Sequence, residues 1–99
     1  MKPLKLLLIL CTGEDTDAVR ELIDKHHIHG FTEITGLRGS GESGLHMGTR
    51  AFPGSASLIF TAVPPEQSLS LIGDLRHLSE KCMPGEGVRV FVLDAAEAV

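Results

Sequence analysis

Hydrophobic positions along the chain fall into four strand-like runs. Residues 3–11 are apolar apart from Lys5, which is typical of a strand buried on both faces, and the run is too short for a membrane span. Residues 31–37 and 55–63 carry β-branched and aromatic side chains, and residues 88–93 form a last apolar run. These four segments are therefore predicted to be strands.

Two stretches between these runs carry apolar residues at helical spacing. The first follows a break at Thr12, which can cap a helix, and is predicted to be closed by Gly30. Its apolar positions are Ala18, Val19, Leu22 and Ile23. Pro65 suits the first turn of a second helix. The face predicted for that helix comprises Leu69, Ile72, Leu75, Arg76 and Ser79, and Leu71, Leu78 and Cys82 flank it.

The order of these elements predicts one domain over residues 1–99 with an α+β fold. The order β-α-β-β-α-β is that of the ferredoxin-like split βαβ sandwich, in which each crossover is right-handed. Two helices cover only one face of a four-stranded sheet, whereas the first, third and last strands are apolar on both faces. We therefore expect another subunit to bury the second face, which predicts an oligomer.

A long glycine-rich segment separates the second and third strands. Residues 36–54 hold six of the eleven glycines and show little periodicity, so they are predicted to form a long flexible loop with a functional role. Residues 39–44 match G-x-G-x-x-G, but no helical pattern follows, which argues against a dinucleotide fingerprint. The glycine N–H groups can still bind an anion, and Arg38 and Arg50 bracket the loop and can pair with phosphate or carboxylate.

Composition narrows the classes of function. The net charge is −4, the nine basic residues are scattered, and Trp and Tyr are absent, so nucleic-acid binding is not expected. Cys11 and Cys82 are expected to be free thiols. No nucleophile motif occurs with a base and an orienting group, so an enzyme is not expected. The first apolar run is too short for a signal peptide, which favours a cytoplasmic protein without membrane insertion.

Three segments of the chain resemble the PII signal-transduction family. Residues 17–22 are similar to the family's first helix, and the long loop at 36–54 stands in the place of its mobile T-loop. Gly85-Glu86-Gly87 followed by residues 88–94 looks like its B-loop and last strand. The different loop sequence and the absence of tyrosine, which rules out tyrosine uridylylation, indicate a divergent member rather than a typical nitrogen regulator.

The resemblance implies a homotrimer that binds an adenine nucleotide (ADP, AMP or ATP) at subunit clefts. It also implies regulation of a partner, such as a membrane transporter or an enzyme, through the long loop. Val88 stands where the family has a lysine, and Arg89 follows one position later. The ligand-binding residues of this hypothesis are Gly36, Arg38, Gly39, Gly41, Arg50, Gly85, Glu86, Gly87 and Arg89.

An alternative hypothesis is a metal-binding or metal-tolerance trimer, similar to the CutA-type copper-tolerance proteins. His26, His27 and His29 cluster at the end of the first predicted helix, and they would bind the metal with or without Cys82, since imidazole and thiolate are good ligands for divalent transition metals. Adjacent helical residues point in different directions, however, and a helix C-terminus favours charged histidine without any metal. The sequence leaves a solvated, capped helix end as the simpler interpretation.

Overall fold

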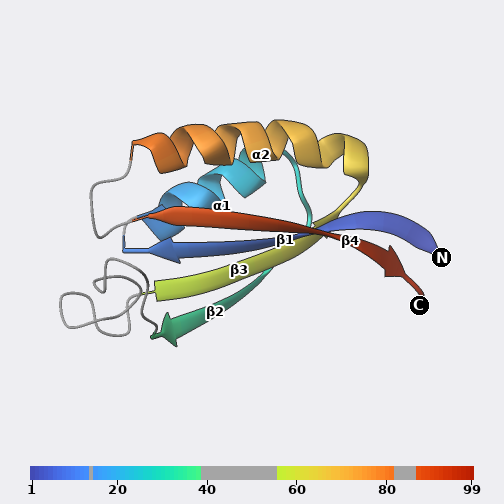
Figure 1. The fold of residues 1–99 in the computed structure, drawn as a ribbon, viewed down its shortest axis with the longest axis horizontal. Helices are drawn as coiled ribbons and strands as arrows, with labels where there is room; N and C mark the ends of the chain where they lie inside the picture. The colour runs from blue at the N-terminus through green and yellow to red at the C-terminus, as the bar shows by residue number, and fades with distance from the viewer. Residues whose placement is uncertain (14, 39–55, 82–86) are drawn as a thin grey trace.

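The fold is given by a computed structural model that describes residues 1–13, 15–38, 56–81 and 87–99. The elements follow the predicted order (Figure 1). They are β1 (Lys2–Thr12), α1 (Asp15–Lys25), β2 (Thr32–Leu37), β3 (Ala56–Val63), α2 (Pro65–Glu80) and β4 (Val88–Glu97).

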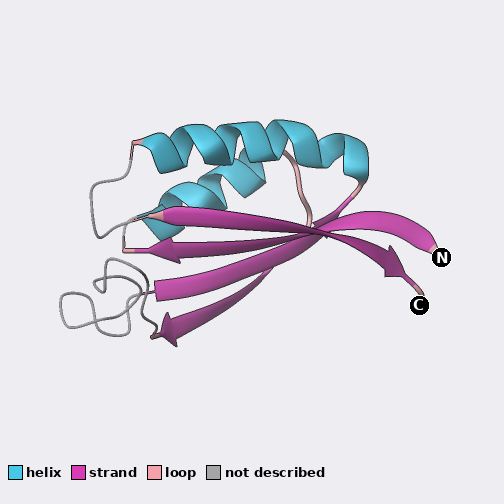
Figure 2. Ribbon diagram, in the orientation of Figure 1, coloured by secondary structure: helices cyan, strands magenta, loops and turns pink. Residues whose placement is uncertain are grey.

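The four strands form one antiparallel sheet in the order β2-β3-β1-β4. Both helices lie on one face of this sheet (Figure 1, Figure 2). The arrangement confirms the ferredoxin-like α+β fold predicted from the order of elements. Among the described residues, no helix is long and apolar enough to cross a membrane.

Strand β4 is four residues longer than predicted. The apolar pattern predicted an end at Leu93, but the strand continues to Glu97, and residues 95–97 pair with the first residues of β1. Alanine has little intrinsic preference for strands, so the pattern missed this part. Pairing with β1 determines where β4 ends instead. This pairing includes an ion pair between the Lys5 ammonium and the Asp94 carboxylate.

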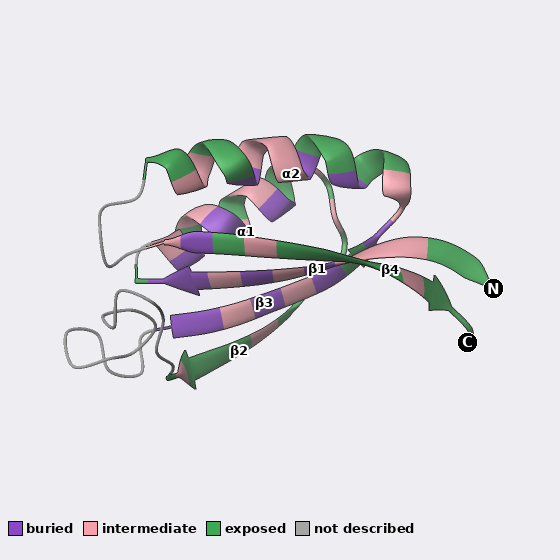
Figure 3. Cartoon of the chain, in the orientation of Figure 1, coloured by how far each residue is buried: buried purple, intermediate pink, exposed green. Residues whose placement is uncertain are grey.

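The face of α2 that packs on the sheet differs in part from the prediction, because Leu75 lies on it as predicted whereas Leu69 does not. Leu71 and Leu75 are fully buried, whereas Leu69 is 74% exposed. The helix carries apolar residues on two overlapping stripes, and the sequence alone does not say which stripe meets the sheet. Packing against the sheet selects the stripe through Leu71 and Leu75 and leaves Leu69 in solvent. Buried and exposed stretches alternate along α2 (Figure 3).

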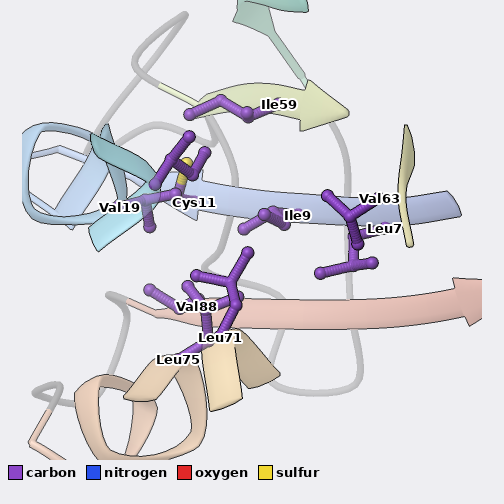
Figure 4. Packing of buried hydrophobic residues seen from close by; sticks show 10 residues of the cluster. Leu7, Ile9, Cys11, Val19, Ile59, Val63, Leu71, Leu75 and Val88 are labelled. Atoms are coloured by element: carbon purple, nitrogen blue, oxygen red, sulfur yellow. The ribbon is translucent and has the colours of Figure 1, made fainter. Parts of the chain in front are cut away.

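The core lies between the helices and one face of the sheet (Figure 4). Alternate strand residues point into it, as the pleat requires. They meet Val19 and Ile23 of α1 and Leu71 and Leu75 of α2. The strand residues of this core are Leu7, Ile9, Cys11, Ile59, Val63 and Val88.

The opposite face of the sheet is apolar as well. Leu8 pairs with Phe60 on one side and with Phe91 on the other, and all three point away from the helices because their neighbours face the core. Ile34, Phe91 and Leu93 on this open face are 45%, 51% and 46% exposed. The expectation of strands that are apolar on both faces is therefore confirmed, and the open face is uncovered in a single chain.

Helix α1 ends earlier than predicted, and His27 rather than Gly30 closes it. The His27 N–H donates to the Asp24 carbonyl at 2.9 Å, and the Ile28 N–H donates to the Ile23 carbonyl at 3.2 Å. This bond pattern is a Schellman motif, whose turning residue must be left-handed. His27 accordingly has φ 57°, a conformation that is costly for any residue with a Cβ.

Replacing His27 by glycine should therefore stabilise the protein by about 0.5–1 kcal/mol, since glycine adopts this backbone without strain. Chemical unfolding of the two proteins measures the difference. The matched control is His29→Gly, because His29 is exposed but has no positive φ. The Schellman assignment is wrong if both substitutions destabilise the protein equally.

A bidentate ion pair fastens the edge strand β2 to α1. Arg20 Nε and Nη2 donate to the two carboxylate oxygens of Glu33 at 2.7 and 2.9 Å, and Arg20 also contacts Asp17. The hydrogen bonds from Arg20 hold the pKa of Glu33 below its ordinary value of 4.5. The Glu33 side chain is only 15% exposed, so solvent screens this pair less than a surface pair.

The contribution of this ion pair should depend on pH. A carboxyl group whose pKa is lowered by folding stabilises the folded state at pH values above its pKa in the unfolded chain. This stabilisation is lost as the pH falls through the lowered pKa of the folded state. Glu33→Gln should thus be less stable than the parent above about pH 4.5, and the gap should close in more acid solution. Urea unfolding across pH 3–7 tests this, with exposed Glu97→Gln as the control. A gap that does not change with pH would contradict it.

Candidate functional site

The candidate ligand residues converge at one end of the sheet. Because neighbouring strands are antiparallel, the last residues of β1 and β2 lie at the same end as the first residues of β3 and β4 (Figure 1). Four of the nine predicted residues are described, and all four lie at this end: Gly36, Arg38, Gly87 and Arg89.

Gly36 lies inside β2 and not in the loop that was predicted to begin there. The pairing of β2 with β3 shifts between Ile34 and Leu37, which marks a β-bulge. Gly36 has φ 70° within it, a conformation that glycine adopts without cost. The bulge turns the end of the strand, and exposed Arg38 follows it directly.

Gly87 is held against the end of β1 by two hydrogen bonds. Its N–H donates to Thr12 Oγ1 at 3.0 Å, and the Thr12 N–H donates to the Gly87 carbonyl at 3.2 Å. Thr12 is buried and belongs to β1, so its predicted role as a helix cap is wrong. Sequence reasoning missed Thr12 as an anchor because the contact joins residues 75 positions apart.

Val88 and Arg89 point to opposite faces of β4, as alternation requires. Val88 is 6% exposed and belongs to the core. Arg89 pairs with Leu10 and lies on the open face, where it is exposed. The cation that follows the glycine turn therefore lies on the face that the strand pattern assigns to another subunit.

One chain does not bring Arg38 and Arg89 together. Arg38 directly follows β2 and Arg89 lies in β4, and these two outer strands have β3 and β1 between them. Three strand spacings separate these edges, which is about 14 Å. The other predicted ligand residues lie outside the described residues: Gly39, Gly41, Arg50, Gly85 and Glu86.

The predicted metal cluster is not assembled. His26 turns toward α2, where its Nε2 lies 2.7 Å from Asp74 Oδ2 and its Nδ1 lies 3.4 Å from Ser70 Oγ. The hydrogen bond from His26, with nearby Lys25, lowers the pKa of Asp74. His27 and His29 are exposed, and no group of three or more His, Cys, Asp or Glu side chains in the described ranges could hold a metal ion. His26 instead links the end of α1 to α2.

Cys11 is a free thiol in the core. Burial raises its pKa, so the unreactive thiol form persists at neutral pH. Its sulfur lies 3.8 Å from the Ser57 carbonyl, to which it can donate a weak hydrogen bond. Cys11 is therefore a packing residue, and Cys82 lies outside the described residues.

Solved structures share this fold. CPII, a nitrogen regulatory PII-like protein from Thiomonas intermedia K12 bound to ADP, AMP and bicarbonate, is 27% identical, with a TM-score of 0.78 over 97% of this chain and 96% of that chain. The same protein bound to ADP and bicarbonate gives 25% identity and a TM-score of 0.72, covering 96% of this chain and 90% of that chain.

A protein from Thermus thermophilus described as PII-like has the same fold. It is 23% identical, with a TM-score of 0.67 over 95% of this chain and 88% of that chain. No match was found among curated proteins.

The family described as nitrogen regulatory protein P-II matches residues 4–99. This match leaves out only the first three residues, and the fold agrees with that of the similar solved structures. Identities of 23–27% place the chain far from those relatives. The chain therefore belongs to the nitrogen regulatory protein P-II family, as a divergent member of a group of signalling regulators that are not enzymes.

Proposed function

We propose that this protein is a homotrimeric regulator that binds an adenine nucleotide in clefts between subunits. The observation that carries the proposal is the position of the candidate residues. Gly36 and Arg38 lie at the same end of the sheet as Gly87 and Arg89, but on opposite edges. A second subunit that places its β4 edge near the β2 edge of the first would complete one site from two halves.

The open face of the sheet supports assembly. Ile34, Phe91 and Leu93 are about half exposed there, and Leu6 and Leu8 of β1 lie beside them on the same face. A contiguous apolar surface of this kind is typical of a subunit interface. The open face by itself does not specify how many subunits assemble. The number three comes from the resemblance to PII proteins.

Two observations support an adenine nucleotide as the ligand: the ligands bound to a similar protein, and the chemistry of the candidate residues in this chain. CPII, at 27% identity over nearly its whole length, was solved with ADP, AMP and bicarbonate. In this chain, glycine backbone at Gly36 and Gly87 allows a phosphate to approach closely, and Arg38 and Arg89 supply positive charge. The proposed site also includes residues of the two connecting segments: Gly39, Gly41, Arg50, Gly85 and Glu86.

The proposed output is a switch in the segment between β2 and β3. A nucleotide that contacts this segment in one arrangement only would favour that arrangement. A cytoplasmic partner, such as a membrane transporter or an enzyme, would then bind one state of the segment. Regulation would follow from nucleotide levels without any chemical step.

Titration of ADP by calorimetry tests the proposed site. Arg38→Ala and Arg89→Ala should each weaken binding by about tenfold or more, the typical loss for a charge-assisted hydrogen bond. The control is Lys81→Ala, which removes an exposed cation from the end of α2. Unchanged affinity in both arginine variants would remove these residues from the site, and a parent protein that binds no adenine nucleotide would overturn the proposal.

A further inference from the structure

A groove lies between the two helices and opens on the solvent side of the helical layer. Its volume is about 320 Å³, at the lower end of the roughly 300–1,000 Å³ of small-molecule sites. Each helix contributes residues spaced i, i+3, i+4 and i+7, which lie on one side of a helix. The lining residues are Ala18, Glu21, Leu22, Lys25, Asp74, His77, Leu78 and Lys81.

The proposed trimer leaves this groove open to solvent. Its subunits meet through the open face of the sheet and through the edges of β2 and β4. Every lining residue of the groove instead belongs to α1 or α2, or directly follows α2. The groove therefore shares no residue with the proposed nucleotide site, and an inference about it is independent of nucleotide binding.

Two of the ionisable side chains in the groove have no partner among the described residues. Lys25 Nζ lies 3.7 Å from Asp74 Oδ2, and His77 pairs along its own helix. The side chains of Glu21 and Lys81 form no ion pair or hydrogen bond with the part of the chain that the structure describes. The groove thus presents one available carboxylate on α1 and one available ammonium at the end of α2.

Apolar side chains complete the lining of the groove. Ala18, Leu22 and Leu78 are half-buried there. A ligand with both an ammonium and a carboxylate would pair with both available charges, and an apolar side chain on it would pack against the leucines. A ligand with a single charge would leave Glu21 or Lys81 without a partner, which gives selectivity for a zwitterion.

We propose that the groove between α1 and α2 binds a zwitterionic α-amino acid with an apolar side chain. The carboxylate of the ligand pairs with Lys81, and its ammonium pairs with Glu21. A Kd on the order of 1 mM is expected, because pairs between exposed charges contribute little binding energy. The site would make the protein responsive to the concentration of a free amino acid.

Titration of the isotope-labelled full chain with L-leucine, followed by NMR, tests the proposal. N-acetyl-L-leucine lacks the ammonium, and L-leucinamide lacks the carboxylate. Leucine should shift the amide signals of residues 18–25 and 74–81, and each analogue should bind about threefold or more weakly. No shifts, shifts confined to other residues, or equal binding of the three compounds would overturn the proposal.

Two variants assign the two charges separately. Lys81→Gln should weaken leucine binding and remove the preference for leucine over leucinamide. Glu21→Gln should remove the preference for leucine over N-acetyl-leucine. The matched control is Arg76→Gln, which removes an exposed cation of α2 that does not line this groove. The spectrum of each free variant shows whether it is folded, and folded variants that keep both preferences would overturn the proposal.

Discussion

Leu71→Ala should lower the free energy of unfolding by about 2–5 kcal/mol, because it deletes a fully buried side chain and leaves a cavity in a packed core. This loss is a large share of the roughly 5–15 kcal/mol that holds a typical domain folded. Leu69→Ala is the control on the same helix. Leu69 is 74% exposed, so its loss should change stability by less than about 0.5 kcal/mol.

Urea unfolding at one fixed chain concentration measures both changes, since assembly makes apparent stability depend on concentration. The two variants also decide which stripe of α2 packs on the sheet. A larger loss from Leu69→Ala would mean that the face predicted from sequence, and not the observed one, meets the core.

Phe91→Asp should dissociate the oligomer into monomers. Phe91 is 51% exposed on the open face, in the outer strand β4, and it pairs with Leu8 of β1. Burial of an unpaired carboxylate in an apolar interface costs several kcal/mol, which each copy would contribute. Size-exclusion chromatography with light scattering gives the mass directly, and calorimetry should show that ADP binding is lost with the assembly.

The control for this change is Leu69→Asp, which adds the same charge at an exposed leucine on the helix side. It should leave the oligomer intact. If Phe91→Asp keeps the mass of the parent protein, the open face is not the subunit interface, and the site between subunits loses its structural basis.

Much of the fold follows from periodicity alone. The apolar run in β1, interrupted only by Lys5, predicted a strand buried on both faces, and its alternate residues do divide between the core and the open face. The ends of the strands and the packed faces of the helices were harder to predict, because they depend on contacts between segments that are distant in the sequence. The extension of β4 rests on pairing with the start of β1, and the packed stripe of α2 rests on its fit to the sheet.

For the candidate site too, residue types could be read from the sequence, whereas contacts between distant residues could not. Arg38, Gly87 and Arg89 were identified from residue type and resemblance, and the antiparallel sheet brings them to one end. The anchor at Thr12 was not predicted, because a threonine after an apolar run carries no sign of a partner 75 residues away. The contact of His26 was not predicted either, because its partner Asp74 lies on another helix. His26 contacts Asp74 and does not join His27 and His29 in a metal site within the described residues.

Mixing two defective variants tests the central claim, a nucleotide site completed between subunits. Arg38→Ala and Arg89→Ala chains are refolded together, and ADP binding is compared with each variant alone. If each cleft takes Arg38 from one subunit and Arg89 from its neighbour, about a quarter of the clefts in randomly mixed assemblies regain both arginines and bind ADP with the affinity of the parent protein. If no such clefts appear while the parent protein binds ADP, the two arginines do not meet across a subunit boundary.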